Sequence, residues 1–191
     1  MQYAITSLNN QNIQWAFSLR HELFPDELDY INTIHNYAVK QERLLGLCLT
    51  KKLVAEHFDI PFASTHILHN SFGCPSIAVN EYRISISHTT GWVACAINNS
   101  SIGIDIENMD TFKKEMPLCV FSKKEWDYIC DASNSKESIY RQCQIWTFKE
   151  AYFKAFGSGI PNYRSVSLFD YRHLCFQRVI NNCCMTIFKT M

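Results

Sequence analysis

Apolar and polar residues follow a helical period in the first third of the chain. Between Thr33 and Phe58 the apolar residues recur on one side and the charged residues on the other, which predicts one or two amphipathic helices. The apolar side holds Leu44, Leu45, Cys48, Leu49 and Val54. We expect this helical stretch to end at Asp59-Ile60-Pro61, because the residue before a proline is pushed out of helical angles.

The middle of the chain alternates with the period of a β-strand. Ile84 to Ser87 alternates between apolar and polar side chains, and Trp92 to Ile97 reads as a buried strand after a short turn. Ile102 to Glu107 reads as a third strand after a second turn. Three strands joined by short turns predict an antiparallel meander.

Helix signals return in the second half. Ser122 and Glu125 form the pattern of a capping box, which predicts a helix start after Phe121. A longer helix is expected from about Ser138 to Phe156, ending at Gly157. Short strands are expected at 166–168 and 185–188. Since helices and strands come in separate runs, the pattern indicates an α+β fold.

Composition narrows the class of protein. The 191 residues are 47% hydrophobic and carry 18 basic and 18 acidic side chains, which excludes intrinsic disorder and a broadly basic nucleic-acid binder. The apolar runs are too short to cross a membrane, and the first residues lack the features of a signal peptide, so we expect a cytoplasmic protein. The nine cysteines include no Cys-x-x-Cys motif, so we interpret them as mostly buried thiols, in preference to zinc ligands or disulfides.

Two carboxylates stand out on the predicted strand at 102–107. The isoleucines would point to one face of that strand, and Gly103, Asp105 and Glu107 to the other. Neighbouring carboxylates repel unless a cation or hydrogen-bond donors offset their charge, and the missing side chain at Gly103 leaves room for a ligand. A hard cation such as Mg²⁺ suits such a pair. The alternative is an ordinary solvated strand face.

A third carboxylate lies on the predicted long helix. At helical spacing, Trp146, Glu150 and Lys154 share one face, with Phe153 beside Glu150. A carboxylate among aromatic rings is desolvated, which raises its pKa unless a cation is near. The alternative is an exposed Glu–Lys pair on the helix surface, which contributes little to stability.

Together these segments resemble the 4′-phosphopantetheinyl transferases of the surfactin-synthetase-activating (Sfp) type. That family carries a Gly-x-Asp-x-Glu strand and a Trp-x-x-Lys-Glu-x-x-x-Lys helix, matched here by Gly103, Asp105 and Glu107 and by Trp146, Lys149, Glu150 and Lys154. Weaker family features match Ser87-His88, Phe121-Ser122 with Glu125 and, in part, Gly73-Cys74-Pro75. The resemblance runs from about residue 40 to residue 160.

The resemblance implies a fold of two similar lobes. Each lobe would have a small antiparallel sheet and a long helix, related by a pseudo-two-fold axis, with the active site in the cleft between them. Residues 1–100 would form the N-terminal lobe and residues 101–191 the C-terminal lobe. Because both lobes lie in one chain, we expect a monomer.

The resemblance also implies a reaction. Members of the family transfer the 4′-phosphopantetheine arm of coenzyme A to a serine of an apo acyl, polyketide or peptidyl carrier protein, and release 3′,5′-ADP. Mg²⁺ is the metal that the resemblance implies, and Mn²⁺ stays open as the alternative. No membrane or nucleic-acid partner is expected. Two alternatives stay open, namely an inactive module that binds coenzyme A or a carrier protein, and another Mg²⁺-dependent phosphotransferase or hydrolase.

Roles for individual residues follow from the same resemblance. The metal would bind to Asp105, Glu107 and Glu150; Glu150 would also be the general base, and Lys154 would neutralise the leaving phosphate. Lys149 would act like Lys154 or support the helix, and Ser87 and His88 would bind the 3′-phosphate. Cys74 stands where the family usually has a lysine, and Arg43, Lys51 or Lys52 is our hypothesis for a compensating charge. Glu125 is interpreted as a capping residue.

Charge is unevenly divided between the two halves. Residues 1–100 carry 6 basic and 8 acidic side chains, and residues 101–191 carry 12 and 10. If Asp105, Glu107 and Glu150 are metal ligands, the second half has 12 basic and 7 other acidic residues. This local excess of positive charge suits an anionic substrate. The segment Met109 to Val120 is either a carrier-docking loop or an ordinary solvated loop.

Overall fold

The computed structural model describes residues 1–70, 73–78, 82–112, 120–157 and 162–191. The first half contains β1 (Gln2–Ser7), α1 (Asn10–Ser18), α2 (Pro25–Thr33), α3 (Tyr37–His57), β2 (Ile67–His69), β3 (Pro75–Ile77), β4 (Arg83–Thr89) and β5 (Trp92–Asn98). The second half contains β6 (Ile102–Asn108), α4 (Lys123–Cys130), α5 (Ser135–Phe156), α6 (Leu168–Tyr171), β7 (Cys175–Ile180) and β8 (Cys183–Lys189). A short 3₁₀ helix lies at Tyr163–Ser165.

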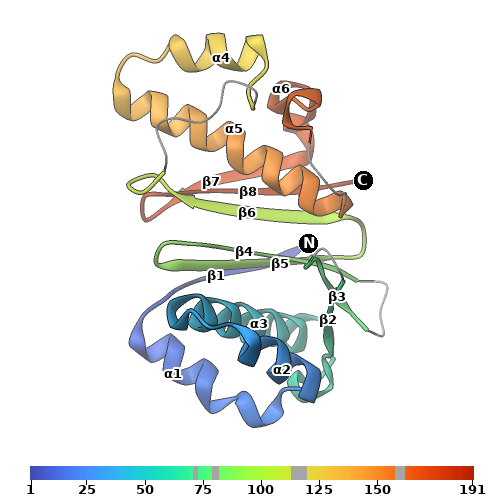
Figure 1. The fold of residues 1–191 in the computed structure, drawn as a ribbon. Helices are drawn as coiled ribbons and strands as arrows, with labels where there is room; N and C mark the ends of the chain where they lie inside the picture. The colour runs from blue at the N-terminus through green and yellow to red at the C-terminus, as the bar shows by residue number, and fades with distance from the viewer. Residues whose placement is uncertain (71–72, 79–81, 113–119, 158–161) are drawn as a thin grey trace.

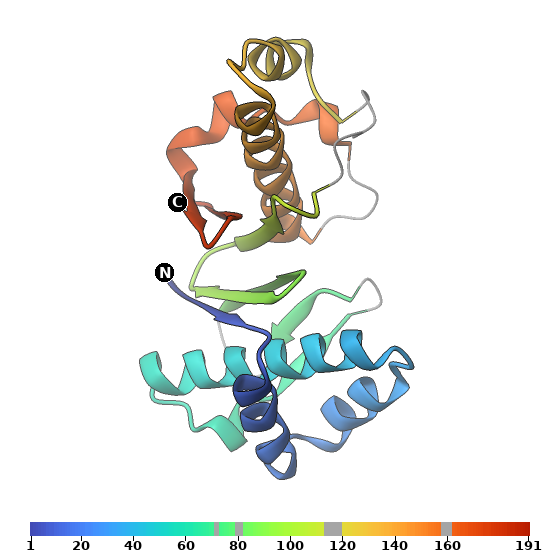
Figure 2. The same ribbon diagram turned by 90° about the vertical axis from the view of Figure 1, so that its left-hand side faces the viewer.

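Two antiparallel three-stranded sheets lie face to face between outer helices (Figure 1). Strand β5 is apolar on both faces, which is why its sheet is covered on both sides. One face packs in the core under α3 and consists of Val93, Cys95 and Ile97. The other face, with Ala94 and Ala96, points to the second sheet. There they meet the isoleucines of β6 and the inner residues of β8. The turned view in Figure 2 shows the same order, with the helices of each half outside its own sheet. The predicted α+β class is confirmed.

The two halves repeat one topology. In each, a first strand is followed by a long helix and then by two hairpin strands, and the last strand lies in the middle of the sheet, in the orders β1-β5-β4 and β6-β8-β7. The long helices α3 and α5 have 21 and 22 residues. The pseudo-two-fold relation and the lobe boundary near residue 100 stay predictions, and the repeated strand order supports both.

The predicted meander is wrong in its third strand. Strands β4 and β5 form the expected hairpin, but β6 pairs with β8 instead of β5. The free edge of β5 is occupied by β1, with Ala96 opposite Tyr3, so β6 begins the second sheet. Pairing between strands far apart in the sequence leaves no local signal, which is why the short turn at 98–101 suggested a continuous sheet.

The helix predictions agree well with the structure. The region 33–58 contains α3, and α4 starts with the capping box of Ser122 and Glu125. Helix α5 ends at Gly157, whose φ of 57° is left-handed and suits glycine. The predicted strand at 166–168 is wrong, because the side chain of Ser167 accepts a hydrogen bond from the Phe169 backbone and starts α6. The strand at 185–188 lies within β8.

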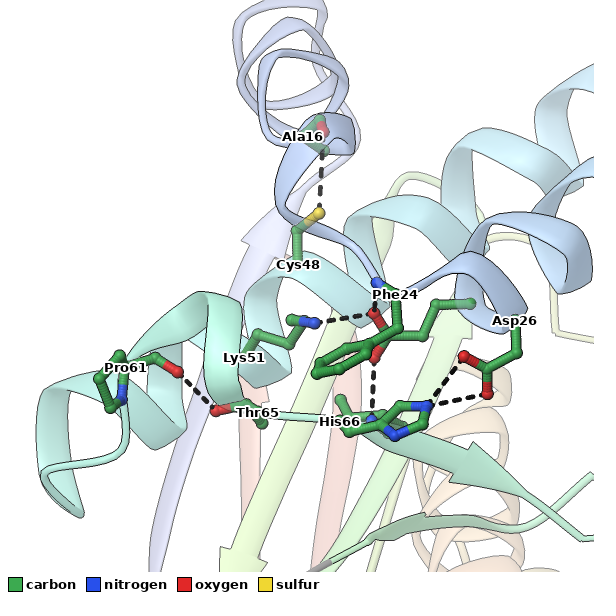
Figure 3. A network of polar contacts seen from close by, with 10 residues as sticks. Ala16, Phe24, Asp26, Cys48, Lys51, Pro61, Thr65 and His66 are labelled. Atoms are coloured by element: carbon green, nitrogen blue, oxygen red, sulfur yellow. Dashed lines mark hydrogen bonds and ion pairs between the residues drawn. The ribbon is translucent and has the colours of Figure 1, made fainter.

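Each half contains a fully buried lysine–glutamate pair. In the first, the ammonium of Lys51 lies 2.7 Å from Glu27 Oε2, and that carboxylate also accepts hydrogen bonds from the backbone amides of Phe24 and Ile67 (Figure 3). In the second, Lys149 Nζ lies 2.9 Å from Glu125 Oε2. Both pairs join the long helix of a half to the short helix before it, so each fixes the packing of two helices.

Most of the described cysteines are buried thiols. Cys48, Cys95, Cys143, Cys183 and Cys184 are buried, and burial raises the pKa of the Cys48 thiol to about 12. Thiols of this kind stay protonated and pack as small apolar side chains. Cys119 lies outside the described residues. Over the described ranges, no helix has both the length and the apolar character needed to cross a membrane.

Candidate functional site

Asp105 is the most enclosed of the three predicted carboxylates. It lies on β6 and is only 4% exposed. Its Oδ1 accepts hydrogen bonds from Ser87 Oγ at 2.8 Å and from Lys154 Nζ at 2.6 Å. A buried carboxylate with these partners is incompatible with the alternative of a solvated strand face.

Glu107 stands two residues further along the same face of β6. Its Oε1 accepts a hydrogen bond from the indole Nε1 of Trp146 at 3.1 Å, and its Oε2 accepts one from Thr89 Oγ1 at 3.3 Å. Burial raises the pKa of Glu107, and the nearby charge of Asp105 raises it further. The site therefore favours a cation that would offset this repulsion.

Glu150 reaches the cluster from α5. Its Oε1 accepts a hydrogen bond from the hydroxyl of Tyr163 at 2.5 Å. Burial raises the pKa of Glu150, and the charge of Asp105 acts in the same direction. Lys154, one turn later, forms its ion pair with Asp105, so the interpretation as an exposed Glu150–Lys154 surface pair is wrong.

The polar positions of β4 join the two sheets at their edges. Alternate residues of this strand point toward β6: Ser85 Oγ accepts from the Ile104 backbone amide at 3.0 Å, and Thr89 Oγ1 accepts from that of Asn108 at 3.1 Å. Ser87, between them, donates to Asp105. The strict alternation of serine and isoleucine in β4 therefore positions the carboxylates of the second half against the first.

A cavity of about 320 Å³ opens beside Asp105, and residues of both halves line it. Its polar lining includes Arg43, Ser87, His88, Asp105 and Lys154, and Cys74 lies at its wall. Burial lowers the pKa of His88, and the charge of Arg43 adds to this effect. Among the described residues, His88 Nε2 and Asp105 Oδ2 are buried with no hydrogen-bond partner. Buried polar atoms are normally paired, so these two point to a ligand.

The three carboxylates are the kind of ligand that a hard metal ion prefers, but their present positions do not form a metal site. Asp105, Glu107 and Glu150 offer carboxylate oxygens, which Mg²⁺ prefers, and Asp105 Oδ2 is available. Over the part of the chain that the structure describes, however, no three His, Cys, Asp or Glu side chains converge closely enough to hold a metal ion. Lys154 now supplies the positive charge next to Asp105.

Comparison with known proteins shows which family the chain is similar to. A family model for the 4′-phosphopantetheinyl transferase superfamily matches residues 101–186, which contain all three carboxylates. The second half of the chain is therefore similar to this superfamily. A 4′-phosphopantetheinyl transferase of Aneurinibacillus migulanus is 32% identical over 132 residues, covering 69% of this chain and 53% of the relative.

Further relatives of the chain carry related names. The 4′-phosphopantetheinyl transferase Sfp of Bacillus subtilis is 24% identical over 137 residues, covering 71% of this chain and 61% of the relative. The mouse L-aminoadipate-semialdehyde dehydrogenase-phosphopantetheinyl transferase is 26% identical over 166 residues, covering 77% and 52%. The chain thus spans a little over half the length of the curated relatives it matches. Its likeness to an Sfp-type transferase, expected from its motifs, is confirmed.

Two of the lysines that were expected to contact coenzyme A do not reach the cavity. The side chains of Lys51 and Lys149 are 0% exposed and are held by Glu27 and Glu125. Lys149 also donates to the backbone carbonyls of Tyr163 and Val166, which supports the second reading of this lysine, that it stabilises the helix. The predicted coenzyme A contacts of Lys51 and Lys149 are therefore corrected: neither ammonium group is available to a ligand.

The other predicted ligand-binding residues lie at the cavity. Arg43 and His88 line it, and His88 has the free Nε2 that a phosphate contact requires. The hydroxyl of Ser87 also lines the cavity but is bonded to Asp105 and Lys154, so it belongs to the carboxylate cluster. Most of the predicted docking loop, residues 113–119, lies outside the described residues.

Gly103 has a different role from the one predicted. A Cβ atom at this position would lie 1.8 Å from the carbonyl oxygen of Ala151 and 2.8 Å from the amide nitrogen of Ala155. The space beside Gly103 is therefore filled by the backbone of α5, and no ligand can enter it. Close contact between β6 and α5 is what brings Asp105 within reach of Lys154.

Replacing Gly103 with alanine is expected to destabilise the protein by about 3 kcal/mol or more, the upper end of the usual cost of overpacking, because backbone atoms cannot move aside. Urea denaturation measures this loss. Gly46→Ala is the matched control, since its Cβ would meet only the side-chain methyls of Ile86 and Val93, at 3.1 and 3.4 Å. Equal losses in the two variants would contradict the role given to Gly103.

Sequence reasoning missed two residues of the site. Tyr163 lies in a stretch with no recognisable pattern, and only the folded chain brings it to Glu150. Thr89 sits at the end of β4, where the alternation of serines with apolar residues could have suggested that it points to the same side as Ser85 and Ser87.

Proposed function

We propose that this protein transfers the 4′-phosphopantetheine arm of coenzyme A to a serine of an apo acyl, polyketide or peptidyl carrier protein, with Mg²⁺, and releases 3′,5′-ADP. The observation that carries the proposal is buried Asp105. It has an unpartnered oxygen beside Lys154, in a cavity also lined by Arg43 and His88. Similarity to the superfamily and the names of the relatives support the substrate class.

The cavity suits the phosphates of coenzyme A. Arg43 supplies a permanent positive charge at one side, and Lys154 supplies a second near the carboxylates. His88, with a free ring nitrogen, offers a further contact for the 3′-phosphate. Transfer of this kind depends mainly on positioning and on neutralising negative charge, so these residues carry much of the catalysis.

Glu150 would remove the proton of the carrier serine. As the serine oxygen forms its bond to the phosphorus that bears the pantetheine arm, the proton passes to the Glu150 carboxylate. The bond from that phosphorus to the bridging oxygen of 3′,5′-ADP breaks, and the leaving phosphate keeps the electron pair. Lys154 is the residue that offsets its charge.

Asp105, Glu107 and Glu150 would hold the metal, which, when bound, offsets charge on the pyrophosphate and polarises the phosphorus under attack. Lys154 would then move from Asp105 Oδ1 toward the phosphates. Removal of divalent cations with EDTA is expected to stop transfer, and added Mg²⁺ to restore it. Mn²⁺ is expected to substitute for Mg²⁺.

Arg43→Ala is expected to raise the KM for coenzyme A about tenfold or more, because a hydrogen bond to a charged group contributes about 1.5–3 kcal/mol. Steady-state kinetics with varied coenzyme A measures the change. Lys52→Ala is the control: Lys52, also a candidate from the sequence, lies on the same helix but is exposed, is paired with Glu56 and is not among the residues that line the cavity. An unchanged KM in Arg43→Ala would show that this arginine does not replace the family lysine at Cys74.

The test of the function uses the full chain, coenzyme A, Mg²⁺ and a panel of apo carrier proteins, one from each of the three classes. Calorimetry with coenzyme A alone accompanies it. Binding without transfer to any carrier would favour an inactive binding module, and the absence of both would favour another Mg²⁺-dependent phosphotransferase or hydrolase. The carrier that reacts fastest identifies the pathway class. The cytoplasmic location and the monomeric state belong to the same proposal, and gel filtration tests the latter.

A further inference from the structure

We propose that Tyr163 is a positioning residue for Glu150: its hydroxyl fixes the orientation of the Glu150 carboxylate toward the metal and the carrier serine. This inference rests on the proposed function. It starts from the 2.5 Å hydrogen bond that the Tyr163 hydroxyl donates to Glu150 Oε1. This hydrogen bond limits the rotation of the carboxylate and occupies one lone pair of Oε1, so it determines how the two oxygens are presented to a ligand.

The ring of Tyr163 is held on two sides. Its centroid lies 5.1 Å from that of Trp146, and it meets Phe153 nearly edge-on at 5.4 Å. Trp146 in turn donates to Glu107 from its indole nitrogen. Two adjacent aromatic residues therefore each hold one carboxylate of the cluster, which spaces Glu107 and Glu150 relative to each other.

The backbone of Tyr163 is anchored from inside the lobe. Lys149 Nζ donates to the Tyr163 carbonyl at 2.7 Å and to the Val166 carbonyl at 2.5 Å, while its charge is paired with Glu125. Glu125 Oε1 also accepts a hydrogen bond from the Leu168 amide, at the other end of this segment. The buried ion pair thus fixes residues 163–168 at both ends and sets the position of the Tyr163 hydroxyl.

This arrangement gives Lys149 an indirect place in the site. It precedes Glu150 in the sequence, but its side chain is fully buried in the core, where it is paired with Glu125. It reaches Glu150 only through the segment that ends in the Tyr163 hydroxyl. Partners that orient a metal-binding or catalytic carboxylate in this way commonly affect activity or metal affinity 10- to 100-fold when removed.

The test compares Tyr163→Phe with the wild-type protein in two measurements. Steady-state kinetics gives kcat and the KM for coenzyme A, and electron paramagnetic resonance gives the affinity for Mn²⁺ without any carrier protein. We expect Tyr163→Phe to lower kcat and Mn²⁺ affinity about tenfold each, with the KM for coenzyme A within about twofold of the wild-type value. Tyr171→Phe is the matched control, because Tyr171 is half-buried in the same lobe and packs on Phe148 in its core.

Each outcome has a defined meaning. Three results would overturn the positioning role of Tyr163. The first is a Tyr163→Phe variant with the kcat and Mn²⁺ affinity of the wild type, and the second is an equal loss of both in Tyr171→Phe. The third is a wild-type protein that does not bind Mn²⁺. A different result would refute the proposed function and still support the role of Tyr163. In that case the wild-type protein binds Mn²⁺ more tightly than Tyr163→Phe does, but it transfers no pantetheine arm to any carrier. Thermal unfolding of each variant confirms that it is folded.

Discussion

Replacing Glu150 with glutamine is expected to reduce pantetheinyl transfer about 100-fold or more, because general acid–base catalysis contributes roughly 10²–10⁴ to the rate. Glutamine keeps the shape of the side chain and an oxygen that can accept the Tyr163 hydrogen bond, but it cannot take the proton of the carrier serine. Coenzyme A affinity should stay within about twofold, since Arg43 and His88, the residues proposed to bind its phosphates, lie on other elements. Kinetics and calorimetry together measure both quantities.

The matched control for this variant is Glu137→Gln. Glu137 lies on the same helix but is in its exposed first turn, where it pairs with Arg141. This control should keep the full rate of transfer. Full activity in Glu150→Gln would contradict the assigned role, and a parallel loss of coenzyme A binding would mean that Glu150 acts in binding instead of proton removal.

Lys149→Met is expected to lower the free energy of unfolding by about 3–5 kcal/mol, the usual cost of leaving one partner of a buried ion pair uncompensated. The effect follows from the complete burial of both Lys149 and Glu125. Burial lowers the pKa of Lys149 and its bonds to Glu125 raise it, so the ion pair is what keeps the lysine charged inside the core. Urea denaturation measures the loss.

A second substitution separates this charge effect from a loss of packing. Glu125→Gln in the Lys149→Met background removes the stranded charge while keeping an oxygen that can cap α4, so it should restore part of the lost stability. Lys52→Met, at an exposed pair, should change stability by no more than about 0.5 kcal/mol. A Lys149→Met variant as stable as Lys52→Met would show that the buried pair does not stabilise the fold.

The two buried pairs also show what the sequence hides. Glu27 and Lys51 are 24 positions apart, as are Glu125 and Lys149, and each glutamate accepts a hydrogen bond from the backbone amide three positions before it. No repeat is visible in the sequence, because the residues around these positions differ. The repeat becomes evident only when the structure shows that the same contacts hold both halves.

Local signals predicted the elements that local chemistry determines. The capping box of Ser122 and Glu125 and the glycine at 157 marked helix ends correctly, and the alternation at Ile102–Glu107 placed Asp105 and Glu107 on one face. Contacts between distant segments were not predictable. The pairing of β6 with β8, the burial of Lys51 and the approach of Tyr163 to Glu150 depend on residues tens of positions away.

The same distinction explains the misassigned lysines. A lysine beside a catalytic motif resembles a phosphate ligand in the sequence, whether it points to the cavity or to the core. Lys149 and Lys154 lie on the same helix, but the first is fully buried and the second reaches Asp105 at the cavity. Only the packing of α4 against α5 decides between them.

The most direct test of the account is the mass of an apo carrier protein after incubation with this chain, coenzyme A and Mg²⁺. Intact-protein mass spectrometry is expected to show the carrier heavier by one phosphopantetheine group, with 3′,5′-ADP formed in equal amount. A carrier in which the acceptor serine is replaced by alanine should keep its mass. Unchanged mass across acyl, polyketide and peptidyl carriers, with a folded protein and Mg²⁺ present, would contradict the proposed function.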